Sequence, residues 1–240
     1  MKIKQHIPNA ITCCNLLCGC LAIVKIFDGD LITASYLVGL ASVFDFFDGF
    51  AARLLKVSSA IGKDLDSLAD MVTFGVVPGF MLFHLINKSL QNESFNQLPK
   101  ELSFLAFIII IFSAIRLAKF NNDTRQTDSF IGVPTPAVAI FISSIPLLLN
   151  QHSDLIILLN PYLLCNLALI LSFLLISELP LFALKFKHFK WKENEIRFSF
   201  LAVSLIFLIT LQFIGVALII IFYIIMSFFI HVFMNKKVKR

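Results

Sequence analysis

Four aspartates lie in stretches that are otherwise strongly apolar. Asp45 and Asp48 fall near the end of one hydrophobic run, and Asp66 and Asp70 fall at the start of the next. The first two are three residues apart and the second two are four apart, so each pair shares one face of a helix. Inserting an acidic side chain deep in a bilayer costs about 2.5–3.5 kcal/mol, so these four side chains require compensating partners.

Shared cations are one such partner. Two antiparallel helices with a short link can turn both pairs together, and four adjacent carboxylates cannot all stay ionised without cations. Hard oxygen ligands favour Mg²⁺ or Mn²⁺, and two bridged ions suit phosphoryl displacement. We therefore expect a site for two divalent metal ions. The spacing alone also fits an ion relay of a transporter, or a structural cluster with Arg53.

Small and basic residues accompany the aspartates. Gly49 and Ala52 follow Asp45 and Asp48 by about one turn each and leave room for a ligand against the helix. Arg53 falls where the helix reaches the headgroup zone, and its guanidinium can hold a diphosphate bidentately. Gly62 is predicted to lie in the link, where it permits the chain to reverse.

The order of these residues resembles the signature of the CDP-alcohol phosphotransferases. The matching pattern is Asp45-x-x-Asp48-Gly49-x-x-Ala52-Arg53, eight residues, then Gly62-x-x-x-Asp66-x-x-x-Asp70. By this resemblance Asp45 and Asp66 would bridge both metal ions, Asp48 would complete one and Asp70 the other. Asp70 would also serve as the catalytic base, and Gly49 and Arg53 would hold the diphosphate of CDP.

Three further stretches are similar to the serine-accepting branch of that family in bacteria. They are IPNAITCCNLLCG, DSLADMVTFGVVPG and SAIRLAKFNN…DSFIGVPTPAVA, and the similarity covers about residues 5–145. The resemblance implies transfer of a phosphatidyl group from CDP-diacylglycerol to L-serine, with release of CMP. The alternatives are another acceptor such as glycerol phosphate or inositol phosphate, an ether-lipid donor, or an ion-coupled transporter. Such transporters often contain inverted repeats, and the aspartate pattern has no second copy.

Two groups of polar residues are further candidates. Asn9, Thr12 and Asn15 recur every three residues along the first helix and can hydrogen-bond the cytosine or ribose, or else neighbouring helices. A second group lies where the fourth helix ends, and can bind the serine carboxylate or the lipid phosphate, or else simply anchor the helix. Its members are Arg116, Lys119 and Asn121.

The elements that position these residues follow from the composition. Of 240 residues, 58% are hydrophobic and only 15% are charged, whereas a soluble domain carries about a quarter charged residues. Apolar blocks near the roughly 20 residues that cross a bilayer predict an all-α, polytopic transmembrane helix bundle of about eight helices. The expected helices are 8–27, 31–55, 66–87, 101–119, 132–149, 155–177, 198–213 and 215–234.

The basic residues predict the orientation of this bundle. Seventeen of the twenty Lys and Arg residues fall on the side of the two termini, and only Lys25, Lys88 and Lys100 fall opposite. Cytoplasmic loops carry such an excess, so both termini and the site are expected at the cytoplasmic face of a bacterial inner membrane. The net charge of +5 then indicates contact with anionic membrane lipids, and no nucleic-acid partner is expected.

We expect three parts along the chain. Residues 1–177 form the catalytic transmembrane core, residues 178–197 a basic cytoplasmic loop, and residues 198–240 a C-terminal transmembrane hairpin with a basic tail. A homodimer is compatible with this organisation.

Overall fold

The computed structural model describes residues 6–57, 59–123, 129–182, 191 and 194–238. Its helices, in chain order, are α1 (His6–Phe27), α2 (Leu31–Leu55), α3 (Ala60–Asp70), the π-helical η2 (Met71–Val76), α4 (Val77–Leu90), the 3₁₀-helical η3 (Lys100–Phe107), α5 (Ile108–Asn122), α6 (Thr135–Gln151), the 3₁₀-helical η4 (Ser153–Leu159), α7 (Pro161–Ile176) and α8 (Glu195–Val238). Two short strands, β1 (Ser129–Ile131) and β2 (Pro180–Phe182), form an antiparallel pair.

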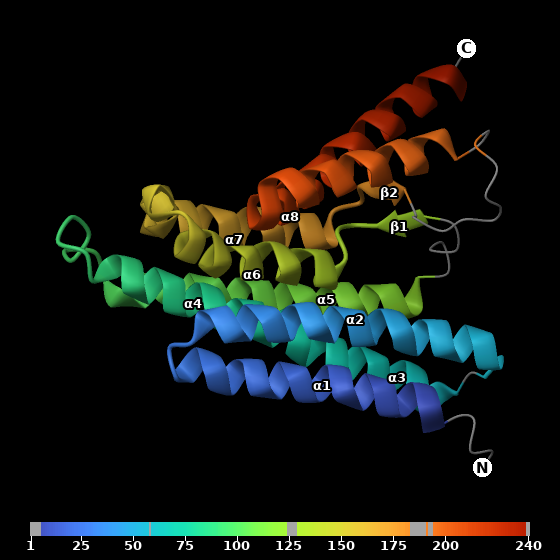
Figure 1. The fold of residues 1–240 in the computed structure, drawn as a ribbon, viewed down its shortest axis with the longest axis horizontal. Helices are drawn as coiled ribbons and strands as arrows, with labels where there is room; N and C mark the ends of the chain where they lie inside the picture. The colour runs from blue at the N-terminus through green and yellow to red at the C-terminus, as the bar shows by residue number, and fades with distance from the viewer. Residues whose placement is uncertain (1–5, 58, 124–128, 183–190, 192–193, 239–240) are drawn as a thin grey trace.

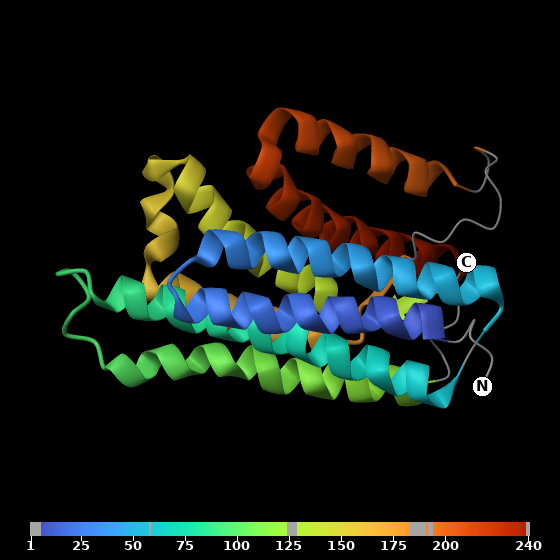
Figure 2. The same cartoon turned by 60° about the horizontal axis from the view of Figure 1, so that its bottom comes forward.

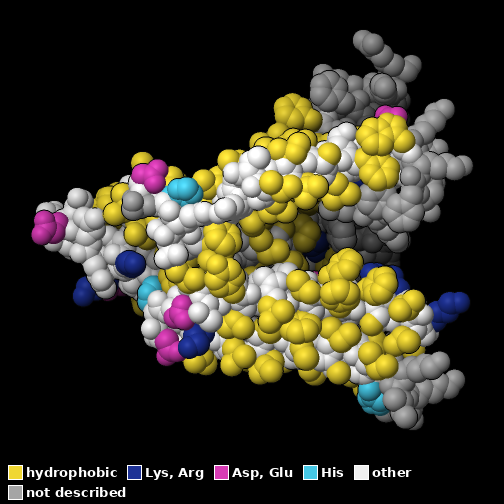
Figure 3. Space-filling view, viewed as in Figure 1, with side chains coloured by type: hydrophobic (Ala, Val, Ile, Leu, Met, Phe, Trp, Pro, Cys, Tyr) yellow, Lys and Arg dark blue, Asp and Glu magenta, His cyan; other side chains and the backbone are white. Residues whose placement is uncertain are grey.

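The predicted all-α membrane bundle is confirmed. Five described helical stretches are long and apolar enough to cross a bilayer, namely α1, α2, the continuous α3–η2–α4, the continuous η3–α5, and α8 up to His231. α6 and α7 are apolar but shorter. Hydrophobic side chains cover the long sides of the molecule, and charged side chains gather near its two ends (Figure 3). The protein is therefore an integral membrane protein.

The helices run back and forth between two ends of the bundle (Figures 1 and 2). α1 and α2 form a hairpin at one side, α3 and α4 return beside α1, and α6 and α7 lie between this layer and α8. The start of α1 and the end of α8 lie at the same end of the bundle in both views. The ends of α2 and α5 and the start of α3 lie there as well.

Short-range signals fix the turn between α2 and α3. Lys56 ends α2 in the left-handed conformation (φ 52°), and Ser59 caps α3 by accepting a hydrogen bond from the Gly62 N–H at 3.0 Å. α3 therefore begins at Ala60, six residues before the predicted start of the third helix. The expectation that Gly62 lies in the link is wrong: it lies inside α3, and the reversal occurs before it.

The third pass contains a π-helical stretch directly after Asp70. This stretch, η2, packs against α1, where Gly19 faces Thr73 so closely that a Cβ atom at position 19 would overlap the Thr73 hydroxyl. The Thr73 hydroxyl also donates to the Asn15 carbonyl oxygen at 3.2 Å. π-helical turns often occur at functional sites, and this one follows a predicted site residue.

The C-terminal half differs in detail from the predicted helices. The sixth helix is interrupted before Pro161, which begins α7 with Asn160 as its cap. α8 folds back on itself at Gln212 (φ 47°, ψ −117°), where the sequence predicts a turn between two helices. Gln151 at the end of α6 hydrogen-bonds Gln212 and so ties this hairpin to the bundle.

The β1–β2 pair joins the segment before α6 to the end of α7. The Gly132 N–H donates to the Leu179 carbonyl oxygen at 2.9 Å, and the Val133 N–H to the Leu174 carbonyl oxygen at 3.0 Å. Gly132 has a φ of +77°, and a Cβ atom there would lie 2.5 Å from the Leu175 carbonyl oxygen. Only glycine fits this contact without strain, so the contact fixes the end of α7 to the segment before α6.

Parts of the predicted basic regions lie outside the described residues. These are residues 1–5, 183–190, 192–193 and 239–240, which hold much of the predicted 178–197 loop and both chain ends.

Candidate active site

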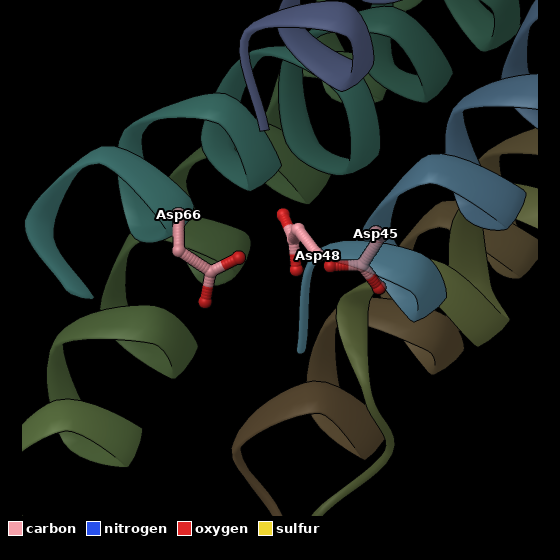
Figure 4. Close-up of side chains that lie close together, drawn as sticks. All are labelled: Asp45, Asp48 and Asp66. Carbon is pink, nitrogen blue, oxygen red and sulfur yellow. The ribbon is translucent and has the colours of Figure 1, made fainter. Parts of the chain in front are cut away.

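Three carboxylates converge between α2 and α3. Oxygen atoms of Asp45, Asp48 and Asp66 all lie within 4.8 Å of one another. Asp45 and Asp48 project from the last turns of α2, and Asp66 projects toward them from α3 (Figure 4). The predicted meeting of the two helical faces is confirmed for these three residues.

Asp70 completes the group one turn further along. Its carboxyl interacts electrostatically with Asp45 and Asp66. Asp48 and Asp70 are the most deeply placed of the four, with 6% and 9% of their surface exposed. No salt bridge to any of the four occurs among the described residues. Their negative charge is therefore concentrated within a helix bundle.

Side chains from α1 orient two of these carboxylates. The Thr12 hydroxyl donates to Asp48 Oδ2 at 2.7 Å, and the Asn15 amide Nδ2 donates to Asp70 Oδ1 at 3.2 Å. Asn15 is fully buried, and its Oδ1 has no hydrogen-bond partner among the described residues. The polar face predicted for the first helix thus points toward the aspartates over part of its length.

A cavity of about 260 Å³ lies beside the carboxylates, at the end of the bundle where α1 begins. Its walls come from the start of α1, the end of α2 and the start of α3. The lining residues are Pro8, Asn9, Thr12, Asp48, Gly49, Ala52, Val57, Ser59, Gly62, Lys63 and Asp66. The two helices that carry the carboxylates therefore also form, together with α1, a pocket large enough for a small polar group.

The predicted diphosphate and nucleotide residues fall unequally around this cavity. Gly49, Ala52 and Gly62 line it, as do Asn9 and Thr12, whereas Asn15 does not. The missing side chain of Gly62 keeps the cavity open. A Cβ atom at this position would lie 3.0 Å from the Asn9 Oδ1 and so narrow the cavity.

Arg53 lies at the rim. Its guanidinium lies beside Gly49, since Nη1 would be 3.6 Å from a Cβ atom at that position. The Arg53 side chain is exposed and interacts electrostatically with Asp48. A cation at this place can reach an anionic group held in the cavity.

The residues predicted to bind the serine carboxylate or the lipid phosphate lie in two separate places. Arg116 and Lys119 line a second cavity of about 370 Å³ between the ends of α5 and α7. Asn121 instead bonds to α3: its Nδ2 donates to Ser67 Oγ at 2.7 Å, and its carbonyl oxygen accepts from Lys63 Nζ at 2.9 Å. Asn121 therefore ties the end of α5 to the helix that carries Asp66.

The carboxylates fit a divalent metal ion. They supply hard oxygen ligands, their oxygens converge on one point, and hydroxyl and amide donors from α1 orient two of them. A cluster of this kind, with no cationic side chain bonded to it among the described residues, can hold a cation that offsets its charge.

Several lining residues were not singled out from the sequence. Ser59 and Lys63 line the first cavity, and Glu178 lines the second. Lys63 lies within the aspartate signature, and Glu178 is an acidic residue at the end of an apolar helix. The positions of these two charged residues are visible in the sequence. They did not indicate a site, because a single charged residue at a helix end is common in membrane proteins.

Comparison with known proteins agrees with this geometry. Residues 5–176 match the family described as CDP-alcohol phosphatidyltransferase. The chain is 34% identical over 191 residues to the CDP-diacylglycerol–serine O-phosphatidyltransferase of Bacillus subtilis strain 168, covering 80% of this chain and 95% of that protein. It is 31% identical over 173 residues to the protein of the same name from Methanocaldococcus jannaschii, covering 72% of each.

A relative of the same name from Helicobacter pylori strain J99 is 35% identical over 147 residues. That alignment covers 60% of this chain, and the chain spans 59% of the length of the Helicobacter protein. The family match includes all four aspartates and the helices from α1 to the end of α7, and it stops before Ser177 and Glu178 of the second cavity. The chain belongs to the CDP-alcohol phosphatidyltransferase family.

Proposed function

We propose that this protein transfers the phosphatidyl group of CDP-diacylglycerol to L-serine and releases CMP. The observation that carries the proposal is the convergence of Asp45, Asp48 and Asp66 beside a cavity lined by the glycine and alanine of the same signature. The names of relatives that are 31–35% identical support the choice of donor and acceptor.

The first cavity is proposed to receive the CDP part of the donor. Asn9 and Thr12 offer amide and hydroxyl groups to the nucleoside, and Gly49 and Gly62 leave space for the diphosphate against the helices. Arg53 and Lys63 bring positive charge to the diphosphate from the rim and the wall. The diacylglycerol part remains in the bilayer, against the exposed aromatic side of α2.

The four aspartates are proposed to hold divalent metal ions, Mg²⁺ or Mn²⁺, with two ions shared among them. When bound, such ions neutralise the diphosphate and polarise the phosphorus that is attacked. Thr12 and Asn15 hold two of the aspartate carboxylates in position through hydrogen bonds, so these carboxylates need little reorganisation during the reaction.

The transfer is an in-line displacement at the phosphorus next to diacylglycerol. The serine hydroxyl oxygen forms a bond to that phosphorus while the bond to the CMP oxygen breaks. We assign Asp70 as the group that takes the hydroxyl proton at its carboxylate. Its position at the inner end of the cluster, within reach of Asp45 and Asp66, supports this role.

The activity can be measured directly. Purified protein in detergent, with CDP-diacylglycerol and Mg²⁺ or Mn²⁺, should release CMP only when L-serine is added. Glycerol phosphate and inositol phosphate should not substitute. The proposal would be overturned by CMP release that one of these alcohols supports better than serine does. Because detergent micelles hold no ion gradient, absence of CMP release with every alcohol would instead favour the transporter.

A matched pair of variants tests the site itself. Asp66→Asn should abolish most of the activity, and a double variant with Asp45→Asn should lose little more, because ligands of shared ions do not act additively. Asp64→Asn serves as the control, since Asp64 is exposed and lies outside the carboxylate group. Wild-type turnover in Asp66→Asn would contradict the metal site.

A further inference from the structure

The second cavity has a composition unlike the first. It lies between the ends of α5 and α7, measures about 370 Å³ and shares no lining residue with the first cavity. Four charged side chains line it: Arg116, Lys119 and Asp123 from α5 and its end, and Glu178 from the segment after α7. The cavity therefore presents both cations together with one acid at the end of α5, and a second acid from the segment after α7.

Arg116 is buried and incompletely bonded. Only 4% of its surface is exposed, and its Nε has no hydrogen-bond partner among the described residues. The guanidinium lies 5.1 Å from the ring centre of Phe120 and interacts electrostatically with Asp123. A buried guanidinium with a free donor is costly unless a ligand accepts from it, so Arg116 points to an anion in this cavity.

Glu178 lies in a segment whose backbone is held by contacts with Gly132. Gly132 packs against the carbonyl oxygens of Leu175 and Ser177, and its N–H bonds to the Leu179 carbonyl oxygen. These contacts fix the chain on both sides of Glu178. Its carboxylate is exposed and lines the cavity, so it is available to a cationic group of a ligand.

The second cavity lies at the level of the aspartates. Ser113, three residues before Arg116, faces Gly75. Asn121, five residues after Arg116, bonds to Ser67. Because α5 runs antiparallel to the α3–η2 helix, Arg116 lies beside the stretch that contains Asp70. The second cavity therefore adjoins the part of the third pass that carries the group to which we assign proton removal.

We infer that the second cavity is the acceptor subsite and that it recognises an amino-acid zwitterion by both of its charges. Arg116, with Lys119 beside it, binds the carboxylate, and Glu178 binds the ammonium group. The remaining hydroxyl group is then directed toward the aspartates. This inference rests on the proposed function and adds to it the basis for choosing serine over alcohols that carry one charge.

Two analogues of serine, each lacking one charge, test the inference. Ethanolamine has no carboxylate, and 3-hydroxypropionate has no ammonium group. With CDP-diacylglycerol as donor, kcat/KM is measured for CMP release with each alcohol. Glu178→Gln should reduce the preference for L-serine over 3-hydroxypropionate about 10- to 100-fold, the usual value of a hydrogen bond to a charged group, and leave the preference over ethanolamine unchanged.

Arg116→Gln should give the opposite pattern, with a reduced preference over ethanolamine only. If that variant does not fold, Lys119→Gln replaces it, because Lys119 is exposed and its effect should have the same direction. Glu93→Gln is the matched control for Glu178: it is an exposed glutamate in the loop between α4 and η3, outside both cavities, and should change neither preference.

The outcomes separate the inference from the proposed function. If serine-dependent CMP release persists in Glu178→Gln with both preferences unchanged, the zwitterion subsite is wrong and the proposed function stands. If the wild-type protein releases CMP equally with and without L-serine, the proposed function is wrong and the inference falls with it. Binding of L-serine alone, followed by titration calorimetry, should weaken in Glu178→Gln and not in Glu93→Gln.

Discussion

Single side chains on α1 decide how two of the aspartates point. Asp48 and Asp70 each accept one hydrogen bond from this helix, from Thr12 and Asn15 respectively. Donors of this kind orient metal-binding carboxylates, and their loss typically costs about 10–100-fold in metal affinity or activity. The Asn15 amide matters most here, because it is fully buried and bonds to the residue assigned as the base.

The Asn15 contact gives a prediction at the scale of the residue. Asn15→Leu keeps the side-chain shape but removes the donor, so turnover should fall about 10–100-fold and the midpoint of Mn²⁺-dependent thermal stabilisation should shift to higher Mn²⁺. Asp70→Asn should lower turnover further, while saturating metal restores binding of the CDP-lipid in both variants. If excess metal instead returned Asp70→Asn to near wild-type turnover, Asp70 would be a ligand only.

The control for Asn15→Leu is another buried polar side chain away from the aspartates. Ser35 on α2 is buried, and its hydroxyl bonds to the Leu31 carbonyl oxygen in the same helix. Ser35→Ala should leave the Mn²⁺ midpoint unchanged. An equal shift in both variants would show that Asn15 acts through general stability.

At the scale of the helices, the sequence predicts features that depend on local spacing and misses those that depend on how helices pack together. The aspartate pairs were predictable because helical periodicity places residues three or four apart on one face, and because charges inside a membrane need partners. The contact of Asn15 with Asp70 and the π-helical turn at η2 depend on how α1 packs against the third pass. No local pattern encodes such long-range packing, so these features were not predictable.

The same limit applies to helix boundaries. The third helix was predicted to start at residue 66, where the apolar run begins, but it starts at Ala60 because Ser59 caps it. The β1–β2 pair was not predicted, since three-residue strands give almost no periodic signal. The fold at Gln212 was predicted from a polar residue and a glycine inside a long apolar run.

The junction between β1 and α7 gives a prediction at the scale of the element. Gly132→Ala places a Cβ atom 2.5 Å from the Leu175 carbonyl oxygen and forces a φ of +77° on alanine. The conformational strain alone is about 1–2 kcal/mol, and the overlap adds to it. We expect a lower midpoint of thermal unfolding in detergent and a higher KM for L-serine, because the end of α7 moves.

Gly29 provides a matched control for Gly132. It has nearly the same φ, +79°, but no atom lies within 4 Å of the place where a Cβ would stand. Gly29→Ala should therefore show the conformational strain without the overlap, and should leave the KM for L-serine unchanged. If the two variants behaved alike, the contact between Gly132 and α7 would have no role in the acceptor subsite.

At the scale of the whole molecule, the helix ends that line the two cavities lie at one end of the bundle. α1 begins and α8 ends at that same end (Figures 1 and 2). For the proposed reaction, this arrangement places the exchange of water-soluble serine and CMP on one side of the membrane, while the lipid part of the donor stays in the bilayer. The basic residues are concentrated toward the same end in the sequence, which favours the cytoplasm as that side. We therefore expect the proposed site to face the cytoplasm.

Cysteine labelling tests this orientation. In a variant without the five native cysteines, Ser59→Cys places a thiol in the turn beside the first cavity, and Glu93→Cys places one in the loop at the opposite end of the bundle. A membrane-impermeant maleimide added to intact spheroplasts should label position 93 and not position 59. After lysis both positions should react, which shows that each thiol is accessible. Labelling of position 59 but not 93 in intact spheroplasts would reverse the topology, and the site would then face away from the cytoplasmic pool of serine and CDP-lipid.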